Sequence, residues 1–197
     1  MERMLKYSTV GGRYKRMTFD GFERELQPVA FDWVTVFARH WEETRENGLW
    51  LLIYGPTGTG KSHLAAAAWN HLRNTGIPAC MVRVPDLLDA FRPSGGEDWE
   101  RRERMRVVQT VDCLVLDDLG TQKTTDWVTE IIYRIVEHRS NEELPTIITT
   151  NTTLEDLEML GASWPAIVSR ITGQAELVPM VGKDYRTVIA ERRGRDD

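Results

Sequence analysis

The sequence lacks the features that mark several large classes of protein. It has only two cysteines, Cys80 and Cys113, and both lie in apolar runs rather than at metal-ligand spacing. We expect them to be buried, reduced thiols of a cytoplasmic protein. The strongest apolar run, Leu49 to Tyr54, is far shorter than the roughly 20 residues of a membrane-spanning helix. Polar residues follow the start of the chain, so neither a membrane span nor a signal peptide is expected.

An excess of positive charge is also missing. The chain of 197 residues has 25 basic and 30 acidic side chains, a net charge of -5. This balance argues against a protein that coats nucleic acid through bulk positive charge, although it is compatible with a local basic groove. With 41% hydrophobic and 28% charged residues, the composition is typical of a folded domain with a real core. The length fits one domain, or one domain with a small appendage.

Strands and helices are predicted to alternate along the chain. After a loose arm to about Asp20, a helix is expected over 28–47, where apolar residues recur at spacings of three and four: Val29, Trp33, Val36, Phe37 and Trp41. Further helices are expected over 62–74, 98–110 and 125–139, with short ones after Thr153 and at Pro165, and strands over 49–54, 79–84, 113–116, 146–149 and 175–180. This alternation predicts an α/β fold, with a mostly parallel sheet covered by helices on both faces.

A phosphate-binding loop follows the first predicted strand. All eight positions of the pattern are present: Gly55, Pro56, Thr57, Gly58, Thr59, Gly60, Lys61 and Ser62. Glycines let successive backbone N–H groups point inward at phosphates, and the next helix adds its free amides and positive dipole end. We expect Lys61 to reach the β- and γ-phosphates and Ser62 to ligate Mg²⁺. The chain is therefore predicted to bind a nucleoside triphosphate.

Two later strands end in polar residues. Asp117 and Asp118 directly follow the apolar strand predicted at 113–116. We expect this strand to lie parallel to and beside the phosphate-loop strand. Asp117 would hold Mg²⁺, in part through water, and Asp118 would orient the attacking water or accept its proton. Asn151 follows the strand at 146–149 and could distinguish a triphosphate from a diphosphate. Plain turns at the ends of strands are the alternative for both positions.

A phosphate loop alone does not determine which reaction a protein catalyses, because small-molecule kinases also carry one. A kinase usually needs a lid with several arginines that closes over the phosphates. The only visible cluster of arginines lies on the helix predicted at 98–110 and consists of Arg101, Arg102, Arg104 and Arg106. Acidic residues interrupt this cluster, so a solvent-exposed helix face is the favoured interpretation. A DNA-facing patch or a subunit contact is the alternative.

The ordered series of motifs resembles a known family. Gly-Pro-Thr-Gly-Thr-Gly-Lys-Ser-His-Leu-Ala, Leu-Val-Leu-Asp-Asp-Leu-Gly, Leu-Pro-Thr-Ile-Ile-Thr-Thr-Asn, Val-Ser-Arg-Ile and Gly-Lys-Asp-Tyr-Arg are similar to the AAA+ ATPase domain of bacterial DnaC/DnaI-type helicase loaders. The IstB-type transposition ATPases share these motifs. The resemblance covers roughly Tyr14 to Arg186, and it implies a five-stranded sheet in the order 5-1-4-3-2. We expect an arm over 1–17, an ATPase domain over 18–190 without a helical lid, and a tail over 191–197.

The resemblance also assigns roles to individual positions. Asn151 matches the sensor of the fourth strand, and Arg170 matches the arginine finger that completes a neighbouring subunit's site. Arg186 stands where the family has a second arginine near the nucleotide. His63 is similar to the histidine of the phosphate-loop helix, and a structural role fits it better than a catalytic one. Asp118 stands where many AAA+ proteins have glutamate, which predicts slow hydrolysis, although DnaI-like sequences share the pair.

Taken together, the resemblance implies an ATP- and Mg²⁺-dependent ATPase of DNA replication. It would assemble with copies of itself when ATP is bound, bind single-stranded DNA and remodel or recruit a hexameric replicative helicase. A transposition or phage helper ATPase that recruits another enzyme is the alternative, and a small-molecule phosphotransferase is a weaker one. Fewer than 20 residues precede the ATPase core. We therefore expect the helicase-gripping domain of the relatives to be missing, or the chain to be a fragment.

Overall fold

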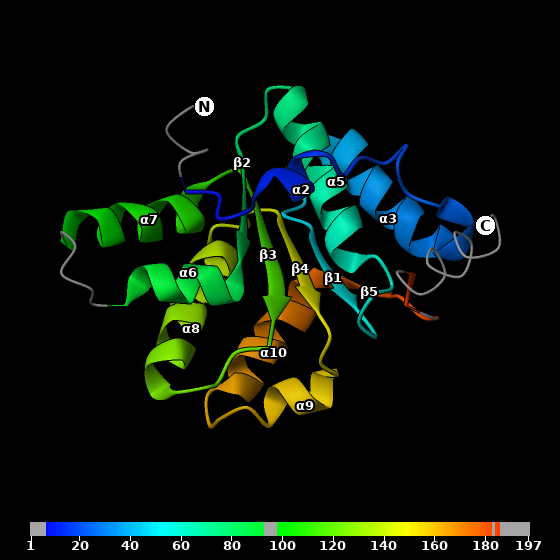
Figure 1. Ribbon diagram of the computed structural model, residues 1–197. Helices are drawn as coiled ribbons and strands as arrows, with labels where there is room; N and C mark the ends of the chain where they lie inside the picture. The colour runs from blue at the N-terminus through cyan, green and yellow to red at the C-terminus, as the bar shows by residue number, and fades with distance from the viewer. Residues whose placement is uncertain (1–6, 93–97, 183, 186–197) are drawn as a thin grey trace.

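The architecture is a three-layer sandwich, seen in a computed structural model that describes residues 7–92, 98–182 and 184–185. A parallel five-stranded sheet in the order β2-β3-β4-β1-β5 forms the middle layer (Figure 1). This confirms the predicted fold class and strand order. The strands are β1 (Trp50–Tyr54), β2 (Ala79–Arg83), β3 (Cys113–Leu119), β4 (Thr146–Thr150) and β5 (Ala175–Pro179).

Side chains alternate between the two faces of the sheet and build two apolar cores. In β1, Trp50 and Leu52 join the core beneath α6 (Val84–Phe91), α7 (Asp98–Thr110), α8 (Asp126–Asn141), α9 (Leu154–Glu158) and α10 (Trp164–Gln174). Leu51 and Ile53 join the other core, beneath α3 (Pro28–Arg39), α4 (Trp41–Glu46) and α5 (Lys61–Asn74). Both layers of helices are visible in Figure 1. With helices on both faces, the inner strands are buried and largely apolar, which is why the short runs in the sequence predict them well. Both cysteines are buried and free, as predicted.

Four details of the predicted elements are wrong. The helix expected over 28–47 is broken at His40 into α3 and α4, and α6 was missed: its first residue, Val84, was predicted as the end of a strand and the rest was assigned to no element. Part of the predicted apolar stripe faces outward: Val29 and Val36 are 60% and 50% exposed and Trp33 is 37% exposed, whereas Phe37 and Trp41 are buried. Ala30, Val34 and Ala38 join Phe37 in covering the core. Finally, β4 lies between β3 and β1, so the strand that carries Asp117 and Asp118 is not beside the phosphate-loop strand.

The arm before the core is ordered rather than loose over residues 7–17. Tyr7, Val10 and Met17 are buried, and α2 (Gly12–Lys15) packs near α5. Two side chains of this arm accept hydrogen bonds from the outer edge of β2: Ser8 Oγ from the Met81 N–H at 3.3 Å and Thr9 Oγ1 from the Arg83 N–H at 3.0 Å. The arm thus satisfies backbone groups that an edge strand leaves free.

A buried arginine links α7, α8 and β4 through hydrogen bonds. Arg139, in the last turn of α8, is fully buried, and its guanidinium donates to the carbonyls of Val108 (3.2 Å), Val111 (2.8 Å) and Pro145 (2.8 Å). Its Nε donates to Thr146 Oγ1 at 2.9 Å. Burial lowers the pKa of Arg139 to about 10. The carbonyls at the end of α7 thus receive from one side chain the donors that a helix terminus otherwise lacks.

Arg139→Met is expected to lower the free energy of unfolding by about 3–5 kcal/mol, because it fills the space but leaves several buried carbonyls without donors. Urea denaturation followed by circular dichroism measures this as a lower midpoint. Arg134→Met on the exposed face of the same helix is the matched control and should change the midpoint little. Equal midpoints for the two variants would contradict the assignment.

In the part of the chain that the structure describes, no helix is long and apolar enough to cross a membrane.

Candidate functional site

The phosphate loop joins β1 to α5 at the carboxyl edge of the sheet. Ligands of open α/β sheets bind at this edge. Lys61 is the first residue of α5 and is buried, and its Nζ donates to the carbonyls of Gly55 (2.7 Å) and Pro56 (2.6 Å). Burial lowers the pKa of Lys61, whereas the nearby Asp118 and Asp117 act in the opposite direction. The ammonium is therefore held inside its own loop, where it lines the cavity at this edge of the sheet.

Two glycines of the loop are required by close approaches of the chain. Gly55 has φ +141°, and a Cβ there would lie 1.9 Å from the carbonyl oxygen of Met180. Gly58 has φ +83°, and a Cβ there would lie 2.1 Å from the carboxyl carbon of Asp184. The backbone N–H of Tyr185 also donates to the carbonyl of Gly58 at 2.9 Å. The chain after β5 therefore closes against the loop, and only glycine leaves room for it.

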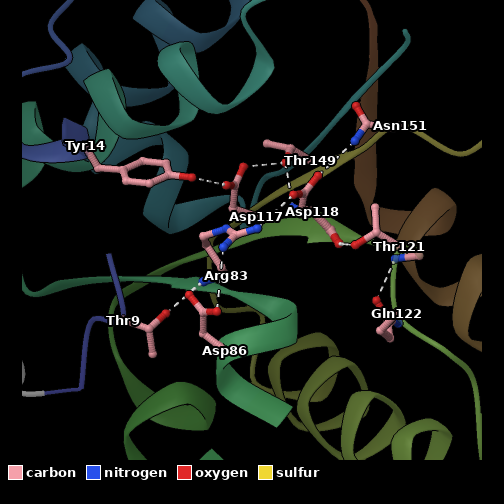
Figure 2. Close-up of polar contacts among 11 residues, drawn as sticks. Thr9, Tyr14, Arg83, Asp86, Asp117, Asp118, Thr121, Gln122, Thr149 and Asn151 are labelled. Atoms are coloured by element: carbon pink, nitrogen blue, oxygen red, sulfur yellow. Dashed lines mark hydrogen bonds and ion pairs between the residues drawn. The ribbon is translucent and has the colours of Figure 1, made fainter. Parts of the chain in front are cut away.

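The acid pair sits where β3 leaves the regular ladder. The register with β4 shifts between Leu116 and Leu119, and Asp118 has φ +69°, an uncommon backbone conformation for a non-glycine residue. This irregularity turns the two carboxylates in different directions, as Figure 2 shows. Asp118 Oδ1 accepts from Asn151 Nδ2 at 2.9 Å, and its Oδ2 lies 3.4 Å from Arg83 Nη2. Strain of this kind is found preferentially at functional sites.

Asp117 is completely buried and held by hydroxyl groups. Thr149 Oγ1 donates to its Oδ1 at 2.7 Å, and the Tyr14 hydroxyl donates to its Oδ2 at 3.2 Å (Figure 2). Burial raises the pKa of Asp117, while hydrogen bonds from Ser62, Thr149 and Tyr14 oppose the rise and the Asp118 charge adds to it. The donors to both oxygens are neutral hydroxyl groups, so this buried carboxylate is suited to bind a cation.

Because the pKa of Asp117 is raised in the fold, the folded chain holds this proton more tightly than the unfolded chain. Stability is therefore expected to fall as pH rises from the ordinary value of 3.8 through the raised pKa. Asp117→Asn removes the buried charge, so the nucleotide- and metal-free variant should melt about 2–4 °C higher at pH 7, equivalent to about 1 kcal/mol. Thermal melts in EDTA across this pH range test it, with the exposed Asp20→Asn as the control. A variant that melts below the wild type at pH 7 would contradict the prediction.

A cavity of about 520 Å³ opens above these groups and brings most of the predicted site residues together. The predicted residues that line it are Thr57, Gly58, Thr59, Gly60, Lys61, Ser62, His63, Asp118 and Asn151. Phe22 and Leu26 form an apolar wall, and Tyr185 also lines the cavity. His63 contacts the carbonyl of Thr18 through Nε2 at 3.0 Å and packs edge-on against Phe22, which agrees with a structural role.

Other predicted residues lie outside the lining. Gly55 and Pro56 form the base of the loop, and Asp117 lies behind Asp118. Arg170 lies on α10, where its guanidinium is 3.5 Å from Glu137 Oε1 and 5.0 Å from the centre of the Tyr133 ring, on α8. It is not part of the cavity of its own chain. Arg186 falls outside the described residues.

Three further residues at the acid pair were missed from the sequence. Arg83 ends β2 and pairs in register with Asp117, so the rule that strands deliver polar residues to the carboxyl edge could have found it. Thr149 was predicted only as the last residue of a strand, with no role for its hydroxyl. Tyr14 comes from the arm, and no local signal in the sequence connects it to Asp117.

These residues fit a magnesium–nucleotide complex. The lysine at the start of α5 and the loop amides suit phosphates, and the buried Asp117 with Ser62 beside it suits a divalent cation that keeps some of its water. The volume above them admits a ligand of nucleotide size, with Phe22 available to a base. The lining supplies both a polar and an apolar end, as small-molecule sites usually do.

Comparison with known proteins agrees with this geometry. A family model described as IstB-like ATP binding protein matches residues 33–192. The replicative helicase loader DnaI of Bacillus subtilis (strain 168) is 33% identical over 129 residues, which cover 65% of this chain and 41% of DnaI. The replicative helicase loader DnaC of Escherichia coli (strain K12) is 27% identical over 195 residues, covering 88% of this chain and 78% of DnaC.

A solved structure shows the same fold. The crystal structure of the DnaC helicase loader superimposes with a TM-score of 0.73 at 28% identity, covering 87% of this chain and all of that one. The sheet order and the alternation of strands and helices are those of an AAA+ domain. The phosphate loop, the acid pair and the family match over most of the chain together identify this protein as a member of the family of IstB-like ATP-binding proteins, related to the DnaC and DnaI helicase loaders.

Proposed function

We propose that this chain is a helicase-loader-type ATPase that hydrolyses ATP to ADP and phosphate, binds single-stranded DNA and recruits or remodels a replicative helicase. The observation that carries the proposal is the convergence of the phosphate loop, Asp118 and Asn151 on one cavity, in a chain related to DnaC and DnaI. The match spans 41% of DnaI and 78% of DnaC, so the partner is carried over from the names of those relatives and needs its own test.

The chemistry follows from what each group can do. Asp118 takes the proton of the attacking water, and Asn151, which holds Asp118 at 2.9 Å, keeps that carboxylate aimed at the cavity. Lys61 and the loop amides hold the β- and γ-phosphates. Bound Mg²⁺, near Ser62 and Asp117, would supply neutralisation of charge that develops on the phosphates. Asp118 is one methylene shorter than glutamate, and its position is fixed by an irregular backbone, so slow hydrolysis suited to a switch is expected.

Arg170 supports assembly of several copies. Arg170 lines no part of its own cavity, and its partly exposed guanidinium beside Glu137 of α8 is accessible to a neighbouring copy. In a ring or spiral, each Arg170 would approach the phosphates of a neighbouring copy. A few basic groups per copy along a shared path would then hold a DNA strand, despite the net charge of -5.

A transposition or phage helper ATPase is the second candidate, favoured by the IstB-like family match. The two candidates share the ATP site and differ in the enzyme recruited.

The test uses the purified chain with a non-hydrolysable ATP analogue or with ADP. Fluorescence anisotropy measures binding to labelled single-stranded DNA, and size-exclusion chromatography measures complex formation with the replicative helicase of the same cell or, in parallel, with a transposase. ATP-dependent binding of DNA and helicase is expected. A chain that binds ATP but joins only the transposase would establish the second candidate, and one that binds no nucleotide would overturn both.

A further inference from the structure

Both oxygens of the metal-site carboxylate are held, one by the sheet and the other by the arm. Thr149 donates to Asp117 Oδ1 from the neighbouring strand β4, at 2.7 Å. The second donor comes from far away in sequence: the hydroxyl of Tyr14, 3.2 Å from Oδ2 (Figure 2). A carboxylate held through both oxygens cannot rotate freely.

The Tyr14 hydroxyl is itself positioned by the helix that carries the phosphate loop. Asn70 on α5 is buried, and its Nδ2 donates to the carbonyls of Tyr14 and Met17, both at 2.8 Å. On the other side, Thr9 joins the arm to β2 through the Arg83 N–H. The arm therefore spans from the edge of the sheet to α5, and its tyrosine has a defined place between the phosphate loop and the acid pair.

We propose that Tyr14 is a positioning residue of the metal site, through which the arm orients Asp117 for a magnesium ion or its bound water. The inference rests on the proposed function, in that Asp117 is taken as the cation-side carboxylate of the ATP site. The arm becomes a third component of the site, beside the phosphate loop and the acid pair. Groups that orient a metal-site ligand typically contribute about 10- to 100-fold to metal affinity or activity.

Tyr14→Phe tests the inference, because it removes one oxygen and keeps the ring. Binding of a fluorescent ATP analogue is measured first in EDTA and then as Mg²⁺ is added, together with kcat and KM at each Mg²⁺ concentration. The affinity in EDTA should equal that of the wild type, while the Mg²⁺ concentration for half-maximal effect should rise about tenfold or more. The kcat should recover when Mg²⁺ is raised. Tyr7→Phe, the same change at a buried position of the same arm, is the matched control and should leave the Mg²⁺ requirement unchanged.

The outcomes separate this inference from the proposed function. If Tyr14→Phe melts like the wild type, binds the analogue in EDTA equally well and needs no more Mg²⁺, the positioning role is overturned and the ATPase stands. Weaker binding in EDTA, with an unchanged Mg²⁺ requirement, would also overturn it, since Tyr14, which lines the cavity, would then act on the nucleotide itself. If nucleotide binding and hydrolysis by the wild-type chain do not depend on Mg²⁺, the proposed function itself is overturned.

Discussion

Asp118→Asn is expected to bind ATP with the affinity of the wild type and to hydrolyse it about 10²–10⁴ times more slowly, the usual contribution of a general base. Asparagine also suits the backbone conformation at this position. Asp118 has φ +69°, and asparagine is one of the few residues that accept this conformation. The change therefore removes the base without disturbing the backbone. Phosphate release under single-turnover conditions, beside equilibrium binding of a fluorescent ATP analogue, separates the two steps.

Asp118→Glu provides a comparison. Glutamate is one methylene longer than aspartate, but here it must enter a left-handed backbone that disfavours longer side chains. We therefore expect no gain in rate from the extra methylene. An Asp118→Asn protein that hydrolyses ATP at the wild-type rate would show that another group accepts the proton of water, and the role proposed for Asp118 would be wrong.

Arg170→Ala is expected to slow ATP hydrolysis about 10³-fold or more, as the loss of an arginine finger does, and to leave ATP binding unchanged. In one chain, the guanidinium lies 3.5 Å from Glu137 and over the ring of Tyr133, so it is ordered at the surface before any partner arrives. Sedimentation with a non-hydrolysable ATP analogue should show assembly of the wild type. Arg134→Ala, an exposed arginine of α8, serves as the matched control.

Mixing two inactive variants tests whether Arg170 acts on a neighbour. Lys61→Ala should lack ATP binding but keep its arginine, and Arg170→Ala should keep its ATP site. In a mixed assembly, a Lys61→Ala copy can supply Arg170 to the intact site of an Arg170→Ala copy, so activity should return. If the mixture stays inactive although mixed assemblies form, or the protein stays a monomer at high concentration while Arg170→Ala remains fully active, the arginine does not act between copies.

The parts of the molecule that follow a local rule could be predicted from the sequence. The inner strands are buried on both faces, so short apolar runs locate them, and the phosphate loop is a contiguous pattern whose backbone conformation depends on its own glycines. Asp118 and Asn151 end strands, and parallel strands bring their ends to one edge. These residues meet at one cavity for that reason.

The features that were missed or predicted wrongly from the sequence depend on contacts between distant segments. Val29 and Val36 have the spacing of a buried helix face, yet both lie outside the buried face of α3, which packs against α5. Arg139 looks like any cation at the end of a helix, and only the folded chain surrounds it with carbonyls. Tyr14 reaches Asp117 across 103 positions of sequence, which no periodicity reveals.

The two edges of the sheet limit how copies of this protein can associate. At β2, the side chains of Ser8 and Thr9 already occupy backbone donors, and at β5, Pro179 has no N–H to offer and Glu176 adds an exposed charge. Proline and charge at an edge oppose the addition of another strand. The assembly that we propose would then use side-chain surfaces, such as the one that presents Arg170. In that assembly, the protected edges would keep the copies from joining into a continuous sheet, which ATP hydrolysis could not easily take apart.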